Sequence, residues 1–156
     1  MKDHKKLTNK QRRYLGLIRK MLANDLTKEQ FFMGFYVGGP NLKQDSMVDI
    51  EPDTALKGES IPCGTVGCIM GWAVLLIPEI RSEATECLEM KNDWGLIKNQ
   101  LFNDVSGDLY IALFDSDFKS DLNLAIERVD YILENGIPTN KNEDYLIDVF
   151  LDHYEA

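Results

Sequence analysis

The residues best suited to chemistry lie in one short stretch, where glycines, cysteines and a threonine precede a long apolar run. Free backbone N–H groups at a glycine-rich helix start, together with the helix dipole, suit a phosphate or carboxylate group. This turn is therefore the candidate site for a small anionic ligand or nucleotide, and an aromatic ring nearby could stack on such a ligand. The candidate residues are Gly64, Thr65, Val66, Gly67, Cys68 and Trp72.

The same stretch has a second interpretation, which is packing. Thr65 is a good N-cap for a helix over Val66–Ile77, and the proline at position 78 would end that helix. The helix contains no charged residue, so it should be buried on all sides. Gly67 and Gly71 lie four residues apart and would let another backbone approach closely, at about 1 kcal/mol of helix propensity each. No P-loop or G-x-G-x-x-G spacing is present, and packing is the favoured interpretation.

The three cysteines, at positions 63, 68 and 87, indicate buried structural thiols. Zinc sites need a second pair of Cys or His ligands, and the chain has only His4 and His153, near its opposite ends. A thiolate at Cys63 would be stabilised beside a helix N-terminus, yet no base is evident to activate it. We therefore predict no metal site, no catalytic residue and no cofactor.

The stretch Cys63–Ala73 resembles a C-G-T-x-x-C-x-x-G-W-A signature found in small uncharacterised proteins of bacteria and their phages. Those proteins are also similar to this chain at Leu113–Phe118 and at Ala125–Gly136. Where they often carry Trp-Pro after a Leu-Phe pair, this chain has Asp117-Phe118. The resemblance covers patches between residues 10 and 138. It implies a common fold and origin and transfers no chemistry.

Charge is distributed unevenly along the chain. The formal net charge is −9, yet residues 1–20 contain eight Lys or Arg and one acidic residue, whereas residues 103–156 contain thirteen acidic residues and three basic ones. The acidic body argues against nucleic acid over most of the surface. The basic N-terminus could contact nucleic acid, an acidic partner or the acidic half of the chain itself, and the last is favoured.

Hydrophobic periodicity predicts an all-α domain of six or seven short helices around the central helix. With 156 residues and 44% hydrophobic content, the chain should form a single domain over residues 1–156. A basic amphipathic helix is expected over about residues 9–23. The other predicted helices are a short one opened by Thr27, then Ile80–Met90, one capped by Asp93, one opened at Ser106 or Gly107, one from Ser120 or Asp121 to Asn135, and Asn142–Tyr154.

Residues 41–60 form a polar stretch without a sustained period, predicted to be a long loop. Loops of this length are commonly functional, so it is either a lid or partner-contact segment or a surface excursion. Short strand pairing near Phe35–Val37 stays open. No apolar run approaches the ~20 residues of a membrane-spanning helix. The expectation is a cytoplasmic protein with no membrane contact.

Three classes of function are compatible with this sequence, and an enzyme has the least support. The resemblance implies a non-enzymatic binding protein of phage or mobile-element origin, acting as an inhibitor or anti-defence factor on a host protein. Asp144, Asp148 and Asp152 are the candidate partner-binding residues. The alternative is a sponge-like protein that captures a small molecule at the Gly64–Cys68 turn. A structural role through dimerisation of one apolar helix face is the third, and the oligomeric state is left open.

Overall fold

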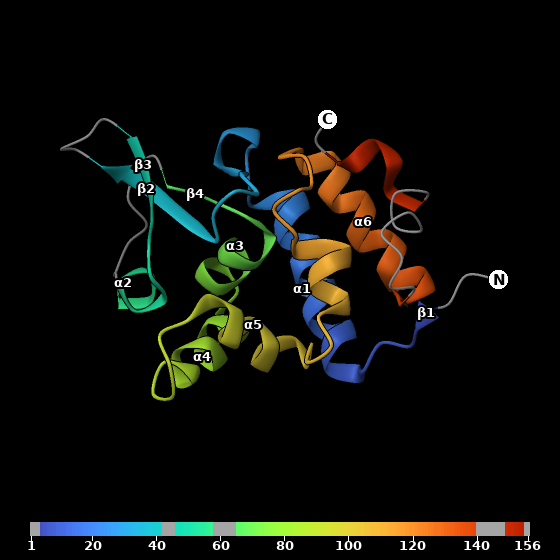
Figure 1. Cartoon of the computed structure of the whole chain (residues 1–156), viewed down its shortest axis with the longest axis horizontal. Helices are drawn as coiled ribbons and strands as arrows, with labels where there is room; N and C mark the ends of the chain where they lie inside the picture. Colours follow the sequence, from blue (N-terminus) through green and yellow to red (C-terminus); the bar gives the residue numbers. More distant parts are fainter. Residues whose placement is uncertain (1–3, 42–45, 58–64, 140–148, 155–156) are drawn as a thin grey trace.

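The computed structural model describes residues 4–41, 46–57, 65–139 and 149–154, and this part of the chain is mostly helical (Figure 1). Its α-helices are α1 (Asn9–Asn24), α2 (Pro52–Lys57), α3 (Ile69–Leu76), α4 (Pro78–Cys87), α5 (Trp94–Phe102) and α6 (Leu122–Asn135). Shorter turns are the 3₁₀ helices η1 (Lys28–Gln30) and η3 (Leu151–His153) and the π-helix η2 (Tyr110–Phe114). The strands are β1 (His4–Lys5), β2 (Val37–Asn41), β3 (Ser46–Asp49), β4 (Val66–Gly67) and β5 (Ile137–Pro138). The predicted fold class is confirmed.

Helix α3 is the buried centre of this fold, as the apolar run predicts. Every residue from Ile69 to Leu75 is buried. Its predicted start at Val66 and the predicted N-cap at Thr65 are wrong, because α3 begins at Ile69 and Cys68 is its N-cap. The physical reason is a strand: residues 66 and 67 pair with β2, and an extended backbone cannot also form the first helical turn. The predicted end before Pro78 is correct, since Pro78 opens α4.

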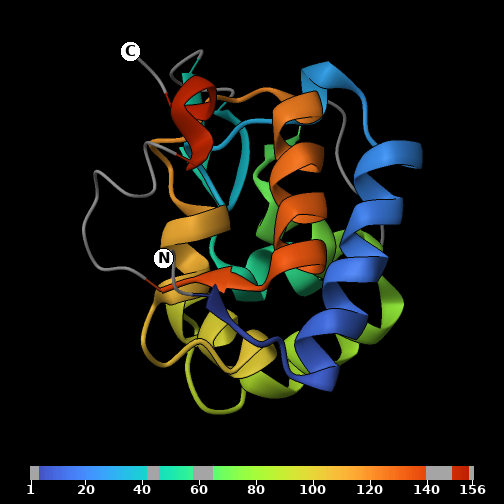
Figure 2. The same ribbon diagram turned by 90° about the vertical axis from the view of Figure 1, so that its right-hand side faces the viewer.

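Helices α1 and α6 pack side by side along one end of the molecule (Figure 2). Thr8 caps α1 through a capping box with Gln11, and Asp121 caps α6 by accepting a hydrogen bond from the N–H of Leu124. Both helices have the extents that their cap residues and apolar spacing predict. Gly136, with φ of 94°, ends α6 in a conformation that glycine adopts easily. Strands β1 and β5 pair beyond this end.

The basic face of α1 is paired partly with acidic side chains of the same chain. Its ion pairs are Lys10–Glu83 at 2.6 Å, Arg13–Glu79 at 2.7 Å and Arg19–Asp130 at 2.8 Å. The Arg19–Asp130 pair reaches the acidic half of the chain, as the favoured interpretation of the basic N-terminus predicts, whereas Glu79 and Glu83 lie before that half. Exposed pairs of this kind contribute at most about 1 kcal/mol each. They orient α1 between α4 and α6, and the apolar core supplies the stability.

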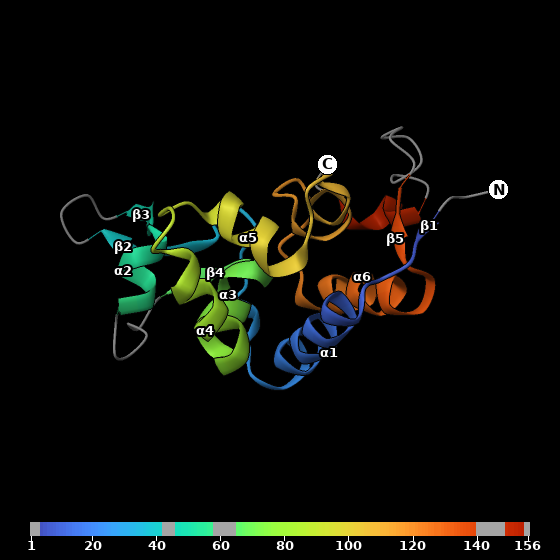
Figure 3. The same ribbon diagram turned by 90° about the horizontal axis from the view of Figure 1, so that it is seen from below.

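The prediction of one long loop over residues 41–60 is wrong for its described residues. Strand β3 pairs antiparallel with β2, and β2 also pairs with β4, which gives a three-stranded sheet in the order β3-β2-β4. Helix α2 follows β3, and the sheet and α2 lie together at the end of the molecule away from β1 and β5 (Figures 1 and 3). The polar composition of these residues gave no signal for the strands or for α2, because their stability comes from pairing and packing with distant segments.

The C-terminal segment packs on α6 through a buried arginine. Of the helix predicted over residues 142–154, the described part contains η3. Arg128 is fully buried, with its guanidinium 4.0 Å from the centre of the Phe118 ring and its Nη1 3.2 Å from His153 Nδ1. The N–H of Lys119 donates to the carbonyl of His153 at 2.7 Å, and Tyr154 forms a β-bridge with Phe118. Burial lowers the pKa of Arg128 to about 10, so it stays a cation at neutral pH.

None of the helices in the described ranges is long and apolar enough to cross a lipid bilayer.

The stability of the fold should depend on the protonation of His153. Burial and the adjacent Arg128 lower its pKa below the ordinary 6.5, while Glu127, Asp121 and Asp152 act weakly in the opposite sense. As pH falls through 6.5, the unfolded chain takes up the proton first, so stability falls until the folded ring is protonated as well. His153→Gln, which can still accept a hydrogen bond, should lose less stability between pH 7.5 and 5.5 than the native protein, measured by urea unfolding. An equal loss in both proteins would contradict this assignment.

Candidate docking groove and the glycine turn

The turn before α3 is crossed closely by another backbone segment, as the packing interpretation predicts. The carbonyl oxygen of Tyr36 lies so near Gly71 that a Cβ there would overlap it, and a Cβ on Gly67 would be 2.8 Å from the same oxygen. The N–H of Cys68 donates to the carbonyls of Phe35, at 3.0 Å, and Tyr36, at 3.3 Å. The carbonyl groups of Phe35 and Tyr36 therefore occupy the place where the anion interpretation would put a ligand.

The predicted ligand-binding residues that the structure describes lie together in the interior. Thr65 and Cys68 are buried, Val66 and Gly67 form β4, and Trp72 donates from Nε1 to the carbonyl of Gln30 at 2.8 Å. Burial raises the pKa of the Cys68 thiol to about 11, so it is protonated at neutral pH. Cys87 is also buried and free. Ligand binding at this turn stays a prediction.

Several predicted residues are placed outside this cluster or outside the described residues. Gly64 and Cys63 lie outside the described ranges, and so do Asp144 and Asp148. Asp152 is exposed on η3. Partner binding by the acidic candidate set therefore also stays a prediction.

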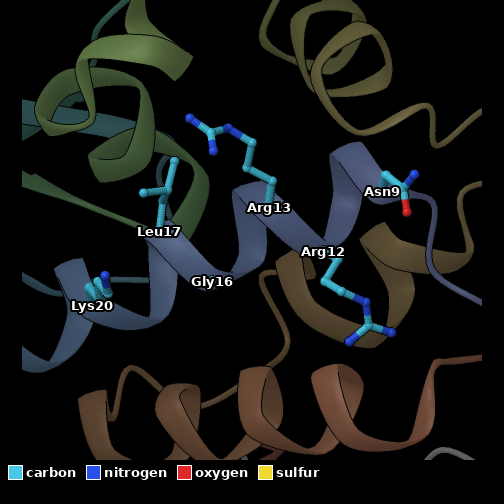
Figure 4. Close-up of a pocket in the computed structure, with 6 residues that line it drawn as sticks. All are labelled: Asn9, Arg12, Arg13, Gly16, Leu17 and Lys20. Carbon is cyan, nitrogen blue, oxygen red and sulfur yellow. The ribbon is translucent and has the colours of Figure 1, made fainter.

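A groove that sequence reasoning missed runs along the exposed face of α1 (Figure 4). Its volume is about 430 Å³. The lining residues follow the three- and four-residue spacing of one helix face: Asn9, Arg12, Arg13, Gly16, Leu17 and Lys20. Gly16 is at the middle of this face, and a Cβ placed on it would meet nothing within 4 Å. Helices α4 and α6 flank α1, and their acidic side chains pair with its edges.

The groove has an apolar floor and cations at its rim. Arg13 is neutralised by Glu79, and this pair raises the pKa of the guanidinium and lowers that of the carboxyl group. Arg12 donates to the carbonyl of Leu133 at 3.2 Å and pairs with no described carboxylate. The ammonium group of Lys20 has no partner among the described residues. Within the described residues, two cations without a carboxylate partner therefore stand at either side of Gly16.

The sequence contains a signal for this groove. A glycine in the middle of an otherwise strong amphipathic helix costs about 1 kcal/mol relative to alanine. At Gly71 a crossing backbone compensates for that cost, whereas nothing described does so at Gly16. The basic residues three and four positions before Gly16 and four after it lie on the same helix face.

No group of three or more His, Cys, Asp or Glu side chains in the described ranges is arranged to hold a metal ion. No family model, no curated protein and no solved structure matches the chain.

Gly16→Ala should raise the free energy of unfolding by about 0.5–1 kcal/mol, because alanine favours the helix and the added methyl group meets no atom. Urea unfolding of the variant and the native protein measures the difference. A loss of stability would show that the space over Gly16 is filled in solution and would contradict an open groove.

Proposed function

We propose that this chain is a non-enzymatic binding protein that docks an acidic segment of a partner protein in the groove on α1. In keeping with the resemblance to bacterial and phage proteins, the partner is a host protein, and binding inhibits it in an anti-defence role. The observation that carries this proposal is the open floor at Gly16 between the cations of Arg12 and Lys20.

The chemistry of the groove favours an acidic polypeptide over nucleic acid. The floor at Gly16 and Leu17 can accept one apolar side chain, which a phosphate backbone lacks. The carboxylates of Glu79, Glu83 and Asp130 on the flanking helices already pair with basic residues of α1, which leaves too few cations for a continuous row of phosphates but enough for one or two carboxylates. Complementary charge at the rim gives specificity and a faster association rate, and the apolar contact gives affinity.

The capture of a small molecule at the Gly64–Cys68 turn is the alternative from the sequence. No described contact favours it, because the carbonyl of Tyr36 lies over Gly67 and Gly71. The proposed docking surface contains none of the candidate ligand-binding or partner-binding residues that the sequence indicates. It lies on the basic N-terminal helix, which would contact an acidic partner.

Site-specific photo-crosslinking in host cells tests this function. A photoreactive residue at Leu17, in the groove, should trap an acidic host protein, and the same residue at Met90, which is 86% exposed elsewhere, should not. The double reversal Arg12→Glu/Lys20→Glu should abolish the crosslink, because it places like charges against the partner. The matched reversal Lys6→Glu/Lys28→Glu changes the net charge equally at exposed positions outside the groove and should leave the crosslink intact.

The proposal fails if the crosslink at Leu17 survives the groove reversal, or if Met90 traps the same protein and Leu17 does not. If the photoreactive residue at Leu17 traps nucleic acid and no protein, the partner is a nucleic acid and the proposal is wrong.

A further inference from the structure

Arg128 on α6 is a fully buried cation that forms no ion pair with a carboxylate in the described part of the chain. Its Nη1 lies 3.2 Å from His153 Nδ1, and the ring of Phe118 lies 4.0 Å from the centre of the guanidinium. Its Nε and Nη2 are buried too, and within the described residues they have no hydrogen-bond partner. Unpaired donors on a buried charge are costly, so this group requires an explanation.

The two unpaired atoms are neighbours on one edge of the guanidinium. On this edge one N–H bond of Nε and one of Nη2 point in the same direction. Two parallel N–H bonds match the two oxygens of a carboxylate or phosphate group, as in bidentate arginine pairs. His153 does not fill this role, because it contacts the other terminal nitrogen, Nη1. The unpaired edge of Arg128 therefore has the geometry of an oxyanion site.

The nearby carboxylates of the chain are engaged elsewhere. Asp121 caps α6, Glu127 is 64% exposed and lies 3.4 Å from His153 Nε2, and Asp152 is exposed on η3. Asp121 and Glu127 raise the pKa of Arg128 from a distance, but burial has the larger effect and lowers it. These carboxylates would repel a multiply charged ligand. One carboxylate group is the anion that this balance of charge favours.

The C-terminal segment, residues 149–154 (red in Figure 1), covers this arginine. Its turn η3 is a single 3₁₀ turn without a side-chain cap, and such a turn is not stable by itself. The N–H of Lys119 donates to the carbonyl of His153 at 2.7 Å, and the ring of Tyr154 stacks on Phe118 at 4.6 Å. Opening the segment returns the unpaired guanidinium edge to water, and the recovered hydration lowers the cost of opening.

We propose that Arg128 binds the carboxylate group of a small apolar acid when the C-terminal segment opens. The two carboxylate oxygens accept hydrogen bonds from Nε and Nη2, and the apolar part of the ligand covers the ring of Phe118 that Tyr154 leaves. The ligand therefore replaces an apolar contact of the segment and adds the counter-ion that no described residue supplies. This site shares no residue with the lining of the docking groove on α1.

Amide hydrogen exchange and chemical shifts of ¹⁵N-labelled protein test this site, with benzoate as the probe at constant ionic strength. Benzoate should shift the amides of Arg128 and His153 saturably. It should bind about tenfold more tightly than acetate or benzyl alcohol, which carry one part of the ligand each. The N–H of Lys119 should exchange faster in saturating benzoate, because it loses the carbonyl of His153. The N–H of Ala125, bonded to the carbonyl of Asp121, should not exchange faster.

Three variants assign the binding to the guanidinium. Arg128→Met replaces the cation with an apolar side chain and should abolish the benzoate shifts. Arg128→Lys keeps the charge without the two parallel N–H bonds and should weaken benzoate binding about tenfold. Arg19→Met is the matched control, since it removes an arginine that pairs with Asp130 at the surface. It should bind benzoate as the native protein does.

The proposal is overturned if benzoate causes no saturable shifts, or if acetate or benzyl alcohol binds as tightly as benzoate. It is also overturned if Arg128→Met binds benzoate as Arg19→Met does, or if the Lys119 amide exchanges at the same rate in saturating benzoate. If Arg128→Met does not fold, native-like binding by Arg128→Lys contradicts the proposal. Because these variants leave the lining of the groove on α1 unchanged, the results are independent of the docking proposal.

Discussion

The fold depends on one close approach, in which the carbonyl of Tyr36 crosses the N-terminal turn of α3. Gly71 and Gly67 leave the space that this crossing needs, and the N–H of Cys68 donates to the crossing backbone. The contact fixes β2 against β4, and through β2 it also positions β3. It further sets the ring of Tyr36 against Trp94, so one backbone contact joins the sheet, the buried helix and α5.

Two helical glycines of the same chain have opposite surroundings. Gly71 costs helix propensity and is compensated inside the protein by the approach of another backbone. Gly16 carries the same cost of about 1 kcal/mol, with open space above it. At Gly71 the crossing backbone offsets this cost inside the protein, whereas at Gly16 no described contact does so. This contrast is the basis for the proposal that the docking surface lies on α1.

Local signals predicted the parts of the fold that local interactions determine. Thr8 and Asp121 cap α1 and α6 as expected, because a side-chain cap needs only its own first turn. Thr65 looked equally suitable, yet the backbone after it is paired as a strand with β2, a partner almost thirty residues earlier in the chain. Long-range pairing also decides the structure of residues 46–57.

The candidate sites were less predictable from the sequence than the helices, because they too depend on contacts between distant segments. The glycine turn was identified correctly as a place of close approach, but the group that approaches it is the chain's own carbonyl. The groove on α1 depends on which helix faces remain uncovered after packing, and spacing alone does not show this. Arg128 illustrates the same limit, because its burial against Phe118 and His153 depends on the packing of the C-terminal segment.

The stability of Gly71→Ala tests the central claim most directly. If the Tyr36 carbonyl lies against Gly71 in solution, the added methyl group must displace backbone, and the free energy of unfolding should fall by about 2 kcal/mol or more despite the better helix propensity of alanine. Urea unfolding measures this difference. A variant as stable as the native protein, or more stable, would contradict the close approach on which the arrangement of the sheet and α3 depends.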